Sequence, residues 1–377
     1  MATPWNKVAL GALALVAAAA VLVVVTGNPA SEPDPADPEP SHLLDGDLLW
    51  TRPGGVSATP GSSGVRDGLA LLQHDGLTLV DLRTGDELWT VRPAARLAGS
   101  TEVYSSGGIL IGAGVLVRTR GGIALLARAD GSVRWRAPVR AGAGERYVPV
   151  AADDRTALVT VGPIRGGAPR VLAVDTGTGQ VRWTRDGLSP YAIAGDTVVG
   201  VTADGTVAAW DLATGATAWT YDGLSAARVA LTASDVVLVE GGTGSGSPVR
   251  RVLSAATGEL LAQLGGDPRT GTCAADGATL IACPLVRGRD DLVFETFGLA
   301  DHLVRTLSGG YRPRAVCLVG PDDLFAAADA DYIAVDRRGR LVADRLPGRP
   351  VAVSGDYLVV RTDTGDPPLT SVYRMRK

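Results

Sequence analysis

The stretch DLATGATAW, residues 211–219, decides the fold, because its spacing of Asp, Gly and Trp at every fourth position recurs along the chain. Residues 81–89 read DLRTGDELW and residues 175–183 read DTGTGQVRW. Weaker copies are GDLLW at 46–50, ARADGSVRW at 127–135, SAATGELLA at 254–262, FGLADHLVR at 297–305 and DRRGRLVA at 336–343. The eight copies end at residues 50, 89, 135, 183, 219, 262, 305 and 343. A period of about 40 residues indicates a repeat architecture.

The composition is typical of an all-β protein with many tight turns. The chain has 377 residues, 49 of them Gly, and Asp-Gly, Gly-Gly and Thr-Gly pairs separate stretches rich in Val, Leu and Thr. The unit that ends at Trp219 divides into four such stretches, at 191–193, 197–202, 206–210 and 216–220. Four antiparallel strands per unit, repeated around an axis, form the blades of a β-propeller.

The recurring residues have structural roles in such a blade. Gly supplies a backbone angle that other residues reach only with strain, and Asp accepts hydrogen bonds from the turn that it opens. Trp on the outer strand is broad enough to fill the wedge between two blades, and its indole N–H needs a partner near the rim. We predict that these residues fasten the blades and take no part in catalysis. The predicted blade-docking residues are Trp50, Asp81, Gly85, Trp89, Trp135, Asp175, Gly179, Trp183, Asp211, Gly215 and Trp219.

The repeat resembles that of the pyrroloquinoline quinone (PQQ) family of β-propellers. Their tryptophan-docking motif, A-x-D-x-x-x-G-x-x-x-W, is complete at 173–183 and at 209–219, and at 79–89 only the Ala is replaced, by Leu79. The resemblance covers residues 45–377 and fades after residue 250. It implies an eight-bladed propeller of four-stranded antiparallel blades, which agrees with the eight copies.

The two ends of the repeat region predict how the ring closes. Trp50 belongs to a fourth strand that has no preceding three. Residues 350–353, 356–361 and 369–375 read as three strands without a fourth. We therefore expect the N-terminal strand to complete the last blade, which removes the exposed edges of an open array.

The first 45 residues predict a membrane anchor and a linker. Residues 8–25, VALGALALVAAAAVLVVV, are long enough at about 1.5 Å per residue to cross a hydrocarbon core of about 30 Å. Lys7 precedes this run and no Lys or Arg follows before Arg52, so the positive-inside rule places the N-terminus in the cytoplasm. Cleavage as a secretory signal peptide, followed by secretion, is the alternative. The expected parts are a cytoplasmic tail at 1–7, a transmembrane signal anchor at 8–27, a Pro-rich acidic linker at 28–45 and an extracytoplasmic propeller at 46–377.

Two of the three cysteines form a candidate disulfide, because an exported chain can oxidise them. Cys273 and Cys283 flank the hairpin sequence CAADGATLIAC. A two-residue turn at 276–277 would place Cys273 opposite Leu280, so a disulfide to Cys283 needs a bulge or a shifted register. The alternative is that these two residues and Cys317 are small buried hydrophobic residues.

The sequence does not favour an enzyme. The dehydrogenases of the family it resembles hold their quinone under a disulfide between adjacent cysteines and over a Ca²⁺ bound by carboxylate and amide oxygens. No cysteines are adjacent here, and Asn occurs only at Asn6 and Asn28. His42, His74 and His302 are scattered and have no partner acid by spacing. We expect no cofactor, no metal and no catalytic residue. A degenerate quinoprotein-like oxidoreductase that binds quinone or sugar is the alternative.

Sorting the charges by loop predicts a ring with two different faces. In a four-stranded blade, the loops after strands one and three emerge on one face and those after strands two and four on the other. Asp predominates in the first set of loops and Arg in the second. Asp favours turns in any case, and Arg is nearly the only cation of the chain, so composition alone is the competing explanation. The predicted anion- or partner-binding face comprises Arg92, Arg96, Arg118, Arg120, Arg140, Arg146, Arg165, Arg287, Arg289, Arg312 and Arg314.

These patterns together predict a membrane-tethered propeller that acts as a scaffold. Arg side chains around a funnel suit the carboxylate or phosphate groups of an envelope protein or of an anionic envelope ligand. Nucleic acid is not favoured, because no aromatic residues interleave with the Arg loops. A ligand-sensing ectodomain is a second alternative, although a cytoplasmic tail of about seven residues is too short to signal alone.

Overall fold

The computed structural model describes most of the repeat region. The chain divides into two compact units, Met1–Pro38 and Glu39–Lys377, and the described residues belong to the second. The predicted cytoplasmic tail, transmembrane helix and linker lie outside the described residues. Within the described part of the chain, no helix is long and apolar enough to cross a membrane. The described residues are 48–57, 64–92, 96–97, 101–163, 169–243, 248–268, 271–287, 291–308, 313–328, 331–343, 345–363, 365 and 367–375.

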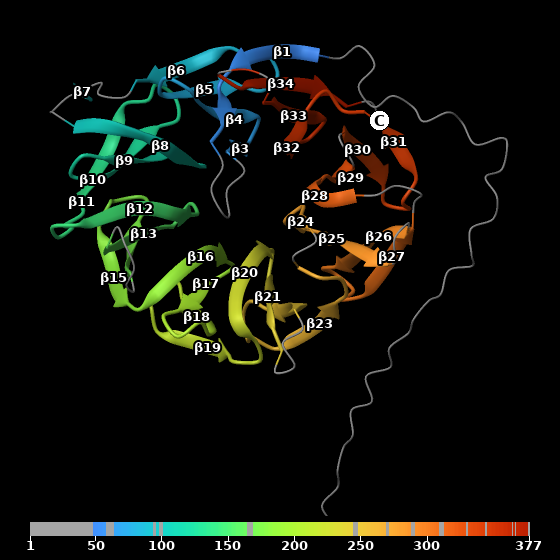
Figure 1. Cartoon of the computed structure of the whole chain (residues 1–377). Helices are drawn as coiled ribbons and strands as arrows, with labels where there is room; N and C mark the ends of the chain where they lie inside the picture. The colour runs from blue at the N-terminus through green and yellow to red at the C-terminus, as the bar shows by residue number, and fades with distance from the viewer. Residues whose placement is uncertain are drawn as a thin grey trace, which may run out of the picture. The chain divides into compact units, whose positions relative to one another are not determined.

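Eight antiparallel sheets, each built on four strands, follow one another around a central opening (Figure 1). The prediction of an all-β, eight-bladed propeller is therefore confirmed. Within a blade the first strand lies nearest the opening and the fourth lies on the outside, as Figure 1 shows for β12 to β15 and for β16 to β19. The first strand is divided into β2 and β3 in blade 1, and β7 extends the sheet of blade 2.

The first four blades span residues 55–221. Blade 1 contains β2 (Gly55–Val56), β3 (Val65–Arg66), β4 (Leu69–Gln73), β5 (Leu77–Asp81) and β6 (Glu87–Val91). Blade 2 contains β7 (Arg96–Leu97), β8 (Thr101–Ile111), β9 (Gly114–Thr119), β10 (Gly122–Ala127) and β11 (Val133–Pro138). Blade 3 contains β12 (Glu145–Ala152), β13 (Thr156–Pro163), β14 (Arg170–Asp175) and β15 (Val181–Asp186). Blade 4 contains β16 (Leu188–Ala194), β17 (Thr197–Thr202), β18 (Val207–Asp211) and β19 (Thr217–Tyr221).

The remaining blades span residues 225–374, and blade 8 takes its last strand from the N-terminal side of the repeat region. Blade 5 contains β20 (Ser225–Ala233), β21 (Val236–Gly242), β22 (Pro248–Ser254) and β23 (Leu260–Leu264). Blade 6 contains β24 (Ala274–Ala275), β25 (Leu280–Arg287), β26 (Asp291–Gly298) and β27 (Val304–Ser308). Blade 7 contains β28 (Pro313–Val319), β29 (Asp323–Ala328), β30 (Asp331–Asp336) and β31 (Leu341–Ala343). Blade 8 contains β32 (Arg349–Ser354), β33 (Tyr357–Thr362), β34 (Leu369–Arg374) and β1 (Leu48–Pro53).

The N-terminal strand closes the ring, as the sequence predicts. β1 pairs antiparallel with β34, with Trp50 opposite Val372. The hydroxyl oxygens of Thr51 and Ser371 are 2.9 Å apart, and the Thr370 hydroxyl donates to the Gly54 carbonyl at 2.6 Å. Blade 8 is therefore assembled from both ends of the repeat region.

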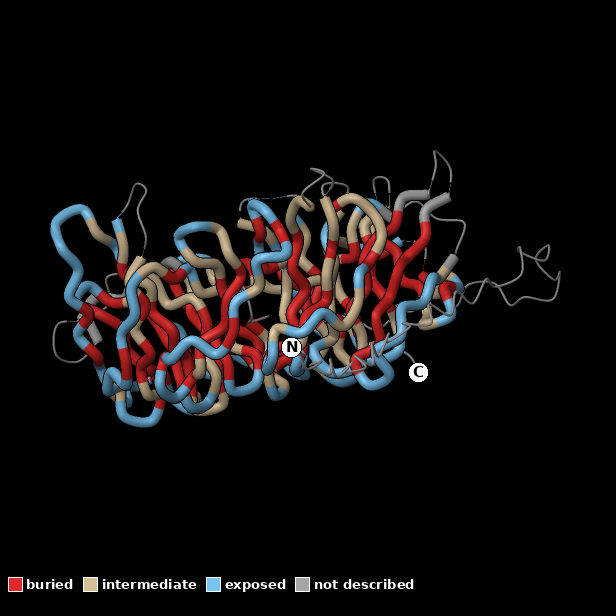
Figure 2. The backbone as a smooth tube through the Cα atoms, turned by 90° about the horizontal axis from the view of Figure 1, so that it is seen from below, coloured by how far each residue is buried: buried red, intermediate tan, exposed pale blue. Residues whose placement is uncertain are grey.

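The apolar core consists of eight clusters, and each is shared by two neighbouring blades. One cluster joins Leu79 and Trp89 of blade 1 to Val117 of blade 2, and another joins Val359 of blade 8 to Val80 of blade 1. Seen edge-on, the buried segments run through the thickness of the ring between two exposed, loop-bearing faces (Figure 2). Each blade therefore buries its two faces against its neighbours, because a single sheet has no core of its own.

Tryptophans of the repeated phrase lie at five of the blade junctions in the described structure. Each indole N–H donates to a backbone carbonyl of the next blade, at 2.7–3.0 Å. The indole ring also packs on the Gly of that next blade. A Cβ on Gly215, whose φ is +69°, would lie 2.7 Å from the Trp183 ring. The donor and Gly pairs are Trp50 with Gly85, Trp89 with Gly131, Trp135 with Gly179, Trp183 with Gly215 and Trp219 with Gly258.

Candidate functional site

The loops after the first and third strands of each blade form one face of the ring, here termed the turn face. Asp81 Oδ1 accepts two backbone N–H groups of its own turn, both at 2.9 Å. Other Asp side chains pair with arginines of a neighbouring blade: Arg128 with Asp67 at 3.0 Å and Arg155 with Asp196 at 2.8 Å. The hydrogen bond to Asp196 raises the pKa of Arg155. The face that we expected to be acidic therefore carries arginines that offset part of its charge.

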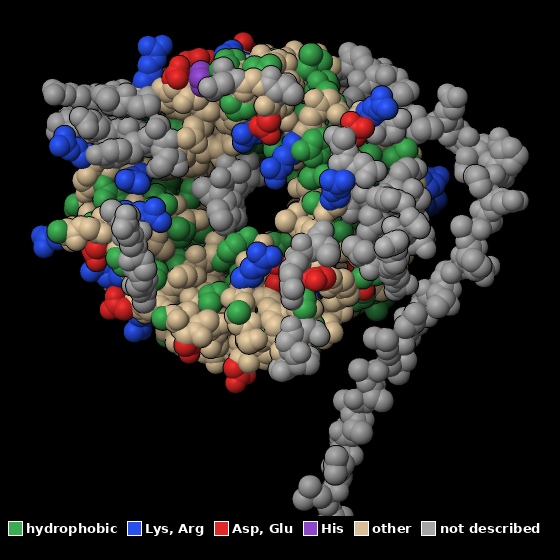
Figure 3. Space-filling model, in the orientation of Figure 1, with side chains coloured by type: hydrophobic (Ala, Val, Ile, Leu, Met, Phe, Trp, Pro, Cys, Tyr) green, Lys and Arg blue, Asp and Glu red, His purple; other side chains and the backbone are tan. Residues whose placement is uncertain are grey.

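The loops after the second and fourth strands form the opposite face, here termed the Arg face. Five of the predicted arginines have exposed side chains at this end of their strands. Figure 3 shows one face of the ring, on which basic side chains lie around the central opening and along the rim. The five are Arg92, Arg120, Arg140, Arg146 and Arg314.

The other six predicted arginines are less informative. The guanidinium carbon of Arg118 lies 5.5 Å from the centroid of the Tyr147 ring, and this side chain is half-buried. It therefore packs against blade 3 as well as facing solvent. For Arg96 and Arg287 the structure describes only the strands that contain them. Arg165, Arg289 and Arg312 lie outside the described residues.

Four pockets of the described structure open on the Arg face, and each is lined by at least one arginine. The largest of the four, about 910 Å³, lies between blades 8 and 1 and is lined by Arg52, Arg92 and His74. A pocket of about 380 Å³ between blades 3 and 4 is lined by Arg146. A pocket of about 350 Å³ beside blade 2 is lined by Arg120 and Arg136. The fourth, about 500 Å³, lies between blades 5 and 6.

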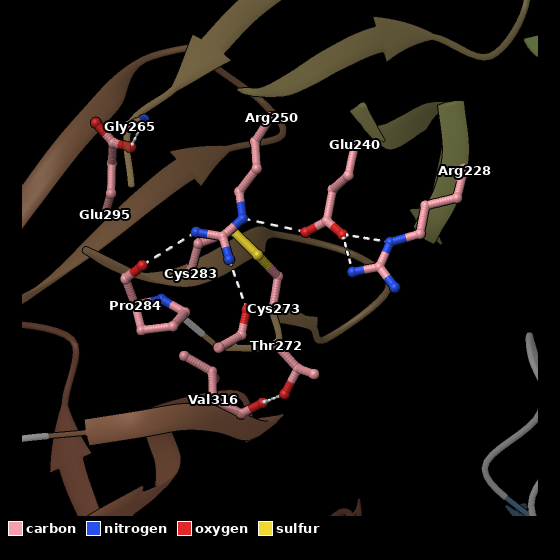
Figure 4. The surroundings of a disulfide bond; sticks show 11 residues. Arg228, Glu240, Arg250, Gly265, Thr272, Cys273, Cys283, Pro284, Glu295 and Val316 are labelled. Carbon is pink, nitrogen blue, oxygen red and sulfur yellow. Dashed lines mark hydrogen bonds and ion pairs between the residues drawn. A yellow bond between two sulfur atoms is a disulfide. The ribbon is translucent and has the colours of Figure 1, made fainter. Parts of the chain in front are cut away.

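The pocket between blades 5 and 6 is built on three charged residues in a row, which sequence reasoning missed. Arg228 lies opposite Glu240 across β20 and β21, and Glu240 lies opposite Arg250 across β21 and β22. Glu240 accepts from Arg228 Nε at 2.9 Å and from Arg250 Nε at 3.1 Å (Figure 4). Arg250 and Glu240 are buried, whereas the Arg228 side chain is 66% exposed. We term these three residues the charged row.

Arg250 also connects blade 5 to blade 6. Its Nη1 donates to the Pro284 carbonyl at 3.1 Å and its Nη2 to the Gly271 carbonyl at 2.5 Å. A guanidinium with no exposed surface needs these acceptors, because a buried donor without a partner costs about 1–3 kcal/mol. The sequence signal is charge inside two apolar strands, a Glu in VVLVEGG and two adjacent arginines in PVRRVLS. Only the strand register shows that the two charges meet.

A disulfide joins Cys273 and Cys283 beside this site, with Cα atoms 4.3 Å apart (Figure 4). The expected two-residue turn is wrong. β24 and β25 pair with Ala274 opposite Ala282, so the cysteines face each other directly. The loop is longer because Asp276 Oδ1 accepts the backbone N–H groups of residues 278, 279 and 280. Cys317 is the remaining cysteine; its thiol is half-buried, and burial raises its pKa.

The described residues do not fit the quinone and Ca²⁺ of the PQQ dehydrogenases. The disulfide joins cysteines that are ten positions apart, so it is not the adjacent pair of those enzymes. In the described part of the chain, no group of three or more His, Cys, Asp and Glu side chains is placed to hold a metal ion. Asn6 and Asn28 lie outside the described residues. We therefore derive no chemistry through a quinone.

Solved structures share the fold at low sequence identity. Quinohemoprotein alcohol dehydrogenase from Comamonas testosteroni is 14% identical, with 89% of this chain and 78% of that chain covered and a TM-score of 0.55. The computationally designed protein Ika8 is 16% identical, with 87% and 100% covered and a TM-score of 0.54. BamB from Moraxella catarrhalis is 20% identical over 85% of each chain, with a TM-score of 0.39. At these identities the likeness of the first two shows the fold alone.

A family model gives a more specific relationship than these structures. No curated protein sequence matches the chain. The family model described as outer membrane protein assembly factor BamB matches residues 73–192 and 119–294, which together span more than half of the chain. The matched region includes the complete motifs at 173–183 and 209–219 and the charged row of blade 5. The chain therefore belongs to the family of PQQ-like repeat propellers described as outer membrane protein assembly factor BamB.

Proposed function

We propose that the chain is a non-enzymatic scaffold that binds a protein of the cell envelope on its Arg face. The family description, an assembly factor for outer membrane proteins, supports a role that depends on other proteins. The observation that carries the proposal is the difference between the two faces. Arg-lined pockets of the described structure open on the Arg face, whereas the Asp side chains of the turn face bind their own turns or pair with Arg128 and Arg155. An anionic envelope ligand would use the same arginines.

The proposed topology follows from the sequence alone. Residues 1–7 remain in the cytoplasm, 8–27 anchor the chain, 28–45 form the linker, and 46–377 form the propeller outside the cytoplasm. Carbonate extraction and protease treatment of intact and opened cells test this arrangement. We expect the chain to stay in the membrane during carbonate extraction, and the propeller to be cleaved by protease added from outside the cytoplasm. Release of the chain by carbonate would indicate cleavage of the N-terminal segment instead.

Photo-crosslinking in intact cells tests the scaffold role. A photo-reactive amino acid at Arg140 or Arg314 on the Arg face should capture a defined envelope protein. The matched controls are Arg83 and Arg338, which are exposed in turns of the turn face and should capture much less. Equal capture from both faces would contradict the proposal.

A charge-removing variant then tests whether the arginines themselves are needed. Replacing Arg92, Arg120, Arg140 and Arg146 by Ser should abolish the capture without lowering the melting temperature, because all four side chains are exposed. Capture that survives in this variant would show that the arginines do not bind the partner.

A further inference from the structure

We infer that the pocket between blades 5 and 6 binds the carboxylate of an acidic side chain on a protein partner, and that Arg228 makes the contact. This inference deepens the proposed function, because it assigns one subsite and its chemistry within the Arg face. The pocket has a volume of about 500 Å³. Among the described residues that line it, Arg228 and Glu240 are charged.

The charged row holds Arg228 in one orientation. Glu240 is almost fully buried, with 4% of its side chain exposed. Its Oε2 accepts from Arg228 Nε at 2.9 Å and forms an ion pair with Arg228 Nη2 at 2.6 Å. Its other oxygen, Oε1, is occupied by Arg250. A long arginine side chain that is already ordered loses little conformational freedom when a ligand binds. The third nitrogen of the Arg228 guanidinium group points away from Glu240 (Figure 4).

The backbone beside Arg228 is unusual in a way that supports a binding site. Ala226 has a φ of +46°, in the left-handed region that non-glycine residues rarely adopt. The pairing of β20 with β21 shifts by one position between Ser225 and Arg228. A bulge at this point re-aims the following side chain, and strained backbone of this kind concentrates at functional sites. Ala226 itself lines the pocket.

The charges around the pocket favour a carboxylate over a phosphate. The charged row contains two guanidinium groups and one carboxylate, so its net charge is that of one cation. Glu295 lies nearby on β26 and accepts the Gly265 N–H, which adds a second carboxylate (Figure 4). With Glu295 counted, the two guanidinium groups and two carboxylates sum to zero, so a dianion would add two uncompensated negative charges and a carboxylate only one. A single carboxylate also matches the planar fork of Arg228.

The walls of the pocket suit a short side chain attached to a peptide. They consist of small or backbone groups from Pro248, Pro268, Gly241 and Gly271. A Cβ on Gly271 would lie 2.2 Å from the Arg314 carbonyl, so this wall is closely packed. A site with one exposed guanidinium and close walls accepts one carboxylate at a time, so any one glutamate of an acidic peptide can occupy it.

Binding of a labelled hexaglutamate peptide to the purified full-length chain tests the inference. Fluorescence anisotropy at low salt should show binding, and hexaglutamine should not bind. The Arg228→Gln variant should bind at least tenfold more weakly, because a charge-assisted, bidentate contact is lost. Arg228→Lys, which keeps the charge without the fork, should be intermediate. The control is Arg338→Gln, an exposed residue of the turn face, for which affinity should change less than twofold.

Three results would overturn the inference. They are no binding of hexaglutamate, an equal loss in Arg228→Gln and Arg338→Gln, and displacement of the peptide by inorganic phosphate at lower concentrations than by acetate. Glu240 is a positioning residue. The Glu240→Gln variant should bind hexaglutamate more weakly, and adding Arg228→Gln to it should weaken binding further. If hexaglutamate does not bind but crosslinking in cells succeeds, the scaffold role stands and the carboxylate subsite is wrong. If hexaglutamate binds but crosslinking fails, the subsite stands and the scaffold role is wrong.

Discussion

The two halves of the ring are fastened by different chemistry. From the junction of blades 8 and 1 to that of blades 4 and 5, a Trp indole lies on a Gly of the next blade and donates to its backbone. In blades 5, 6 and 7 the Trp position holds Ala262, Arg305 and Ala343. Arginines take over: Arg250 reaches two carbonyls across the junction of blades 5 and 6. A junction therefore needs a side chain that fills the space between two blades and a polar contact across it, and Trp supplies both.

The junction of blades 6 and 7 repeats the arginine solution. Arg337 Nη2 in the last turn of blade 7 is 3.0 Å from Asp276 Oδ2 in the first loop of blade 6 and 2.6 Å from the Gly320 carbonyl. Arginine fastening keeps charged groups at the junction, and some of them reach solvent. The Trp-fastened junctions also carry ion pairs, such as Arg128 with Asp67 and Arg155 with Asp196, but these lie on the turn face, whereas Arg250 is buried inside its junction.

Arg250→Ala should have the largest effect on this comparison. It leaves Glu240 without its buried partner and two carbonyls without donors, so we expect the free energy of unfolding to fall by about 3–5 kcal/mol. Urea denaturation followed by Trp fluorescence measures the change. The control is Arg228→Ala at the exposed end of the same charged row, which should cost about 1 kcal/mol or less. Equal losses would mean that the junction of blades 5 and 6 does not depend on Arg250.

Gly215→Ala tests the Trp-fastened half. The substitution places a side chain at a φ of +69° and 2.7 Å from the Trp183 ring, so we expect a loss of about 2–4 kcal/mol. Gly205→Ala is the matched control in the same blade, because its φ is +86° and nothing lies within 4 Å of the added carbon. It should cost about 1–2 kcal/mol. If both variants lose the same stability, the contact with the Trp ring contributes nothing beyond the turn.

Asp323→Thr should stabilise the arginine-fastened half. Burial, together with Asp322 and Asp336, raises the pKa of Asp323 to about 6. The folded state therefore holds this proton more tightly than the unfolded state, so the stabilising contribution is present below about pH 4 and is lost as pH rises through about 6. Thr156 and Thr197 occupy the same register position in blades 3 and 4.

The expected gain for Asp323→Thr is about 2 kcal/mol at pH 7.5, with a flatter dependence of stability on pH between 4 and 6. Urea denaturation over this pH range measures both. Asp235→Thr, at an exposed loop of blade 5, should change stability by about 0.5 kcal/mol or less. An unchanged pH dependence in Asp323→Thr would show that this carboxyl does not control it.

Hydrogen exchange should show the smallest difference. The sequence predicts that the units without Trp are the softer part of the ring. We expect the amides of β30 in blade 7 to exchange about three- to tenfold faster than those of β18 in blade 4, which corresponds to about 1 kcal/mol. Both are third strands with a neighbour on each side, so they are matched within one molecule. Equal protection would mean that arginine fastening is as strong as Trp fastening.

The repeat could be read from the sequence because its signal is local. Turn glycines and the wedge residue lie within nine positions, and the predicted ends of all eight copies fall on fourth strands. Even the most altered copy obeys this rule. Arg305 pairs with Thr296 as Trp219 pairs with Ala209. The turn before Arg305 differs, because the strand pairing there has no bulge and the left-handed residue is His302, with a φ of +55°, instead of a Gly.

The candidate site could be predicted only in part, because its main contacts are not local. Sorting charges by loop located exposed arginines such as Arg92 and Arg140. It could not locate the charged row, since Arg228 and Arg250 meet Glu240 only through the register of three strands. The same limit explains the hairpin of Cys273, where hydrogen bonds to Asp276 set the loop length.

The pairing of β1 with β34 has a consequence for the order of folding. The hydroxyls of Thr51 and Ser371 are 320 positions apart in the chain, so β1 cannot pair with β34 until β34 has been synthesised. Local strand pairs form early, whereas a contact of this sequence separation forms late. Blades 1 to 7 can assemble one after another, but no shorter piece of the repeat region completes the eighth. Ring closure therefore requires the whole repeat region, and until β34 is present the unpaired edge of β1 can pair with other strands.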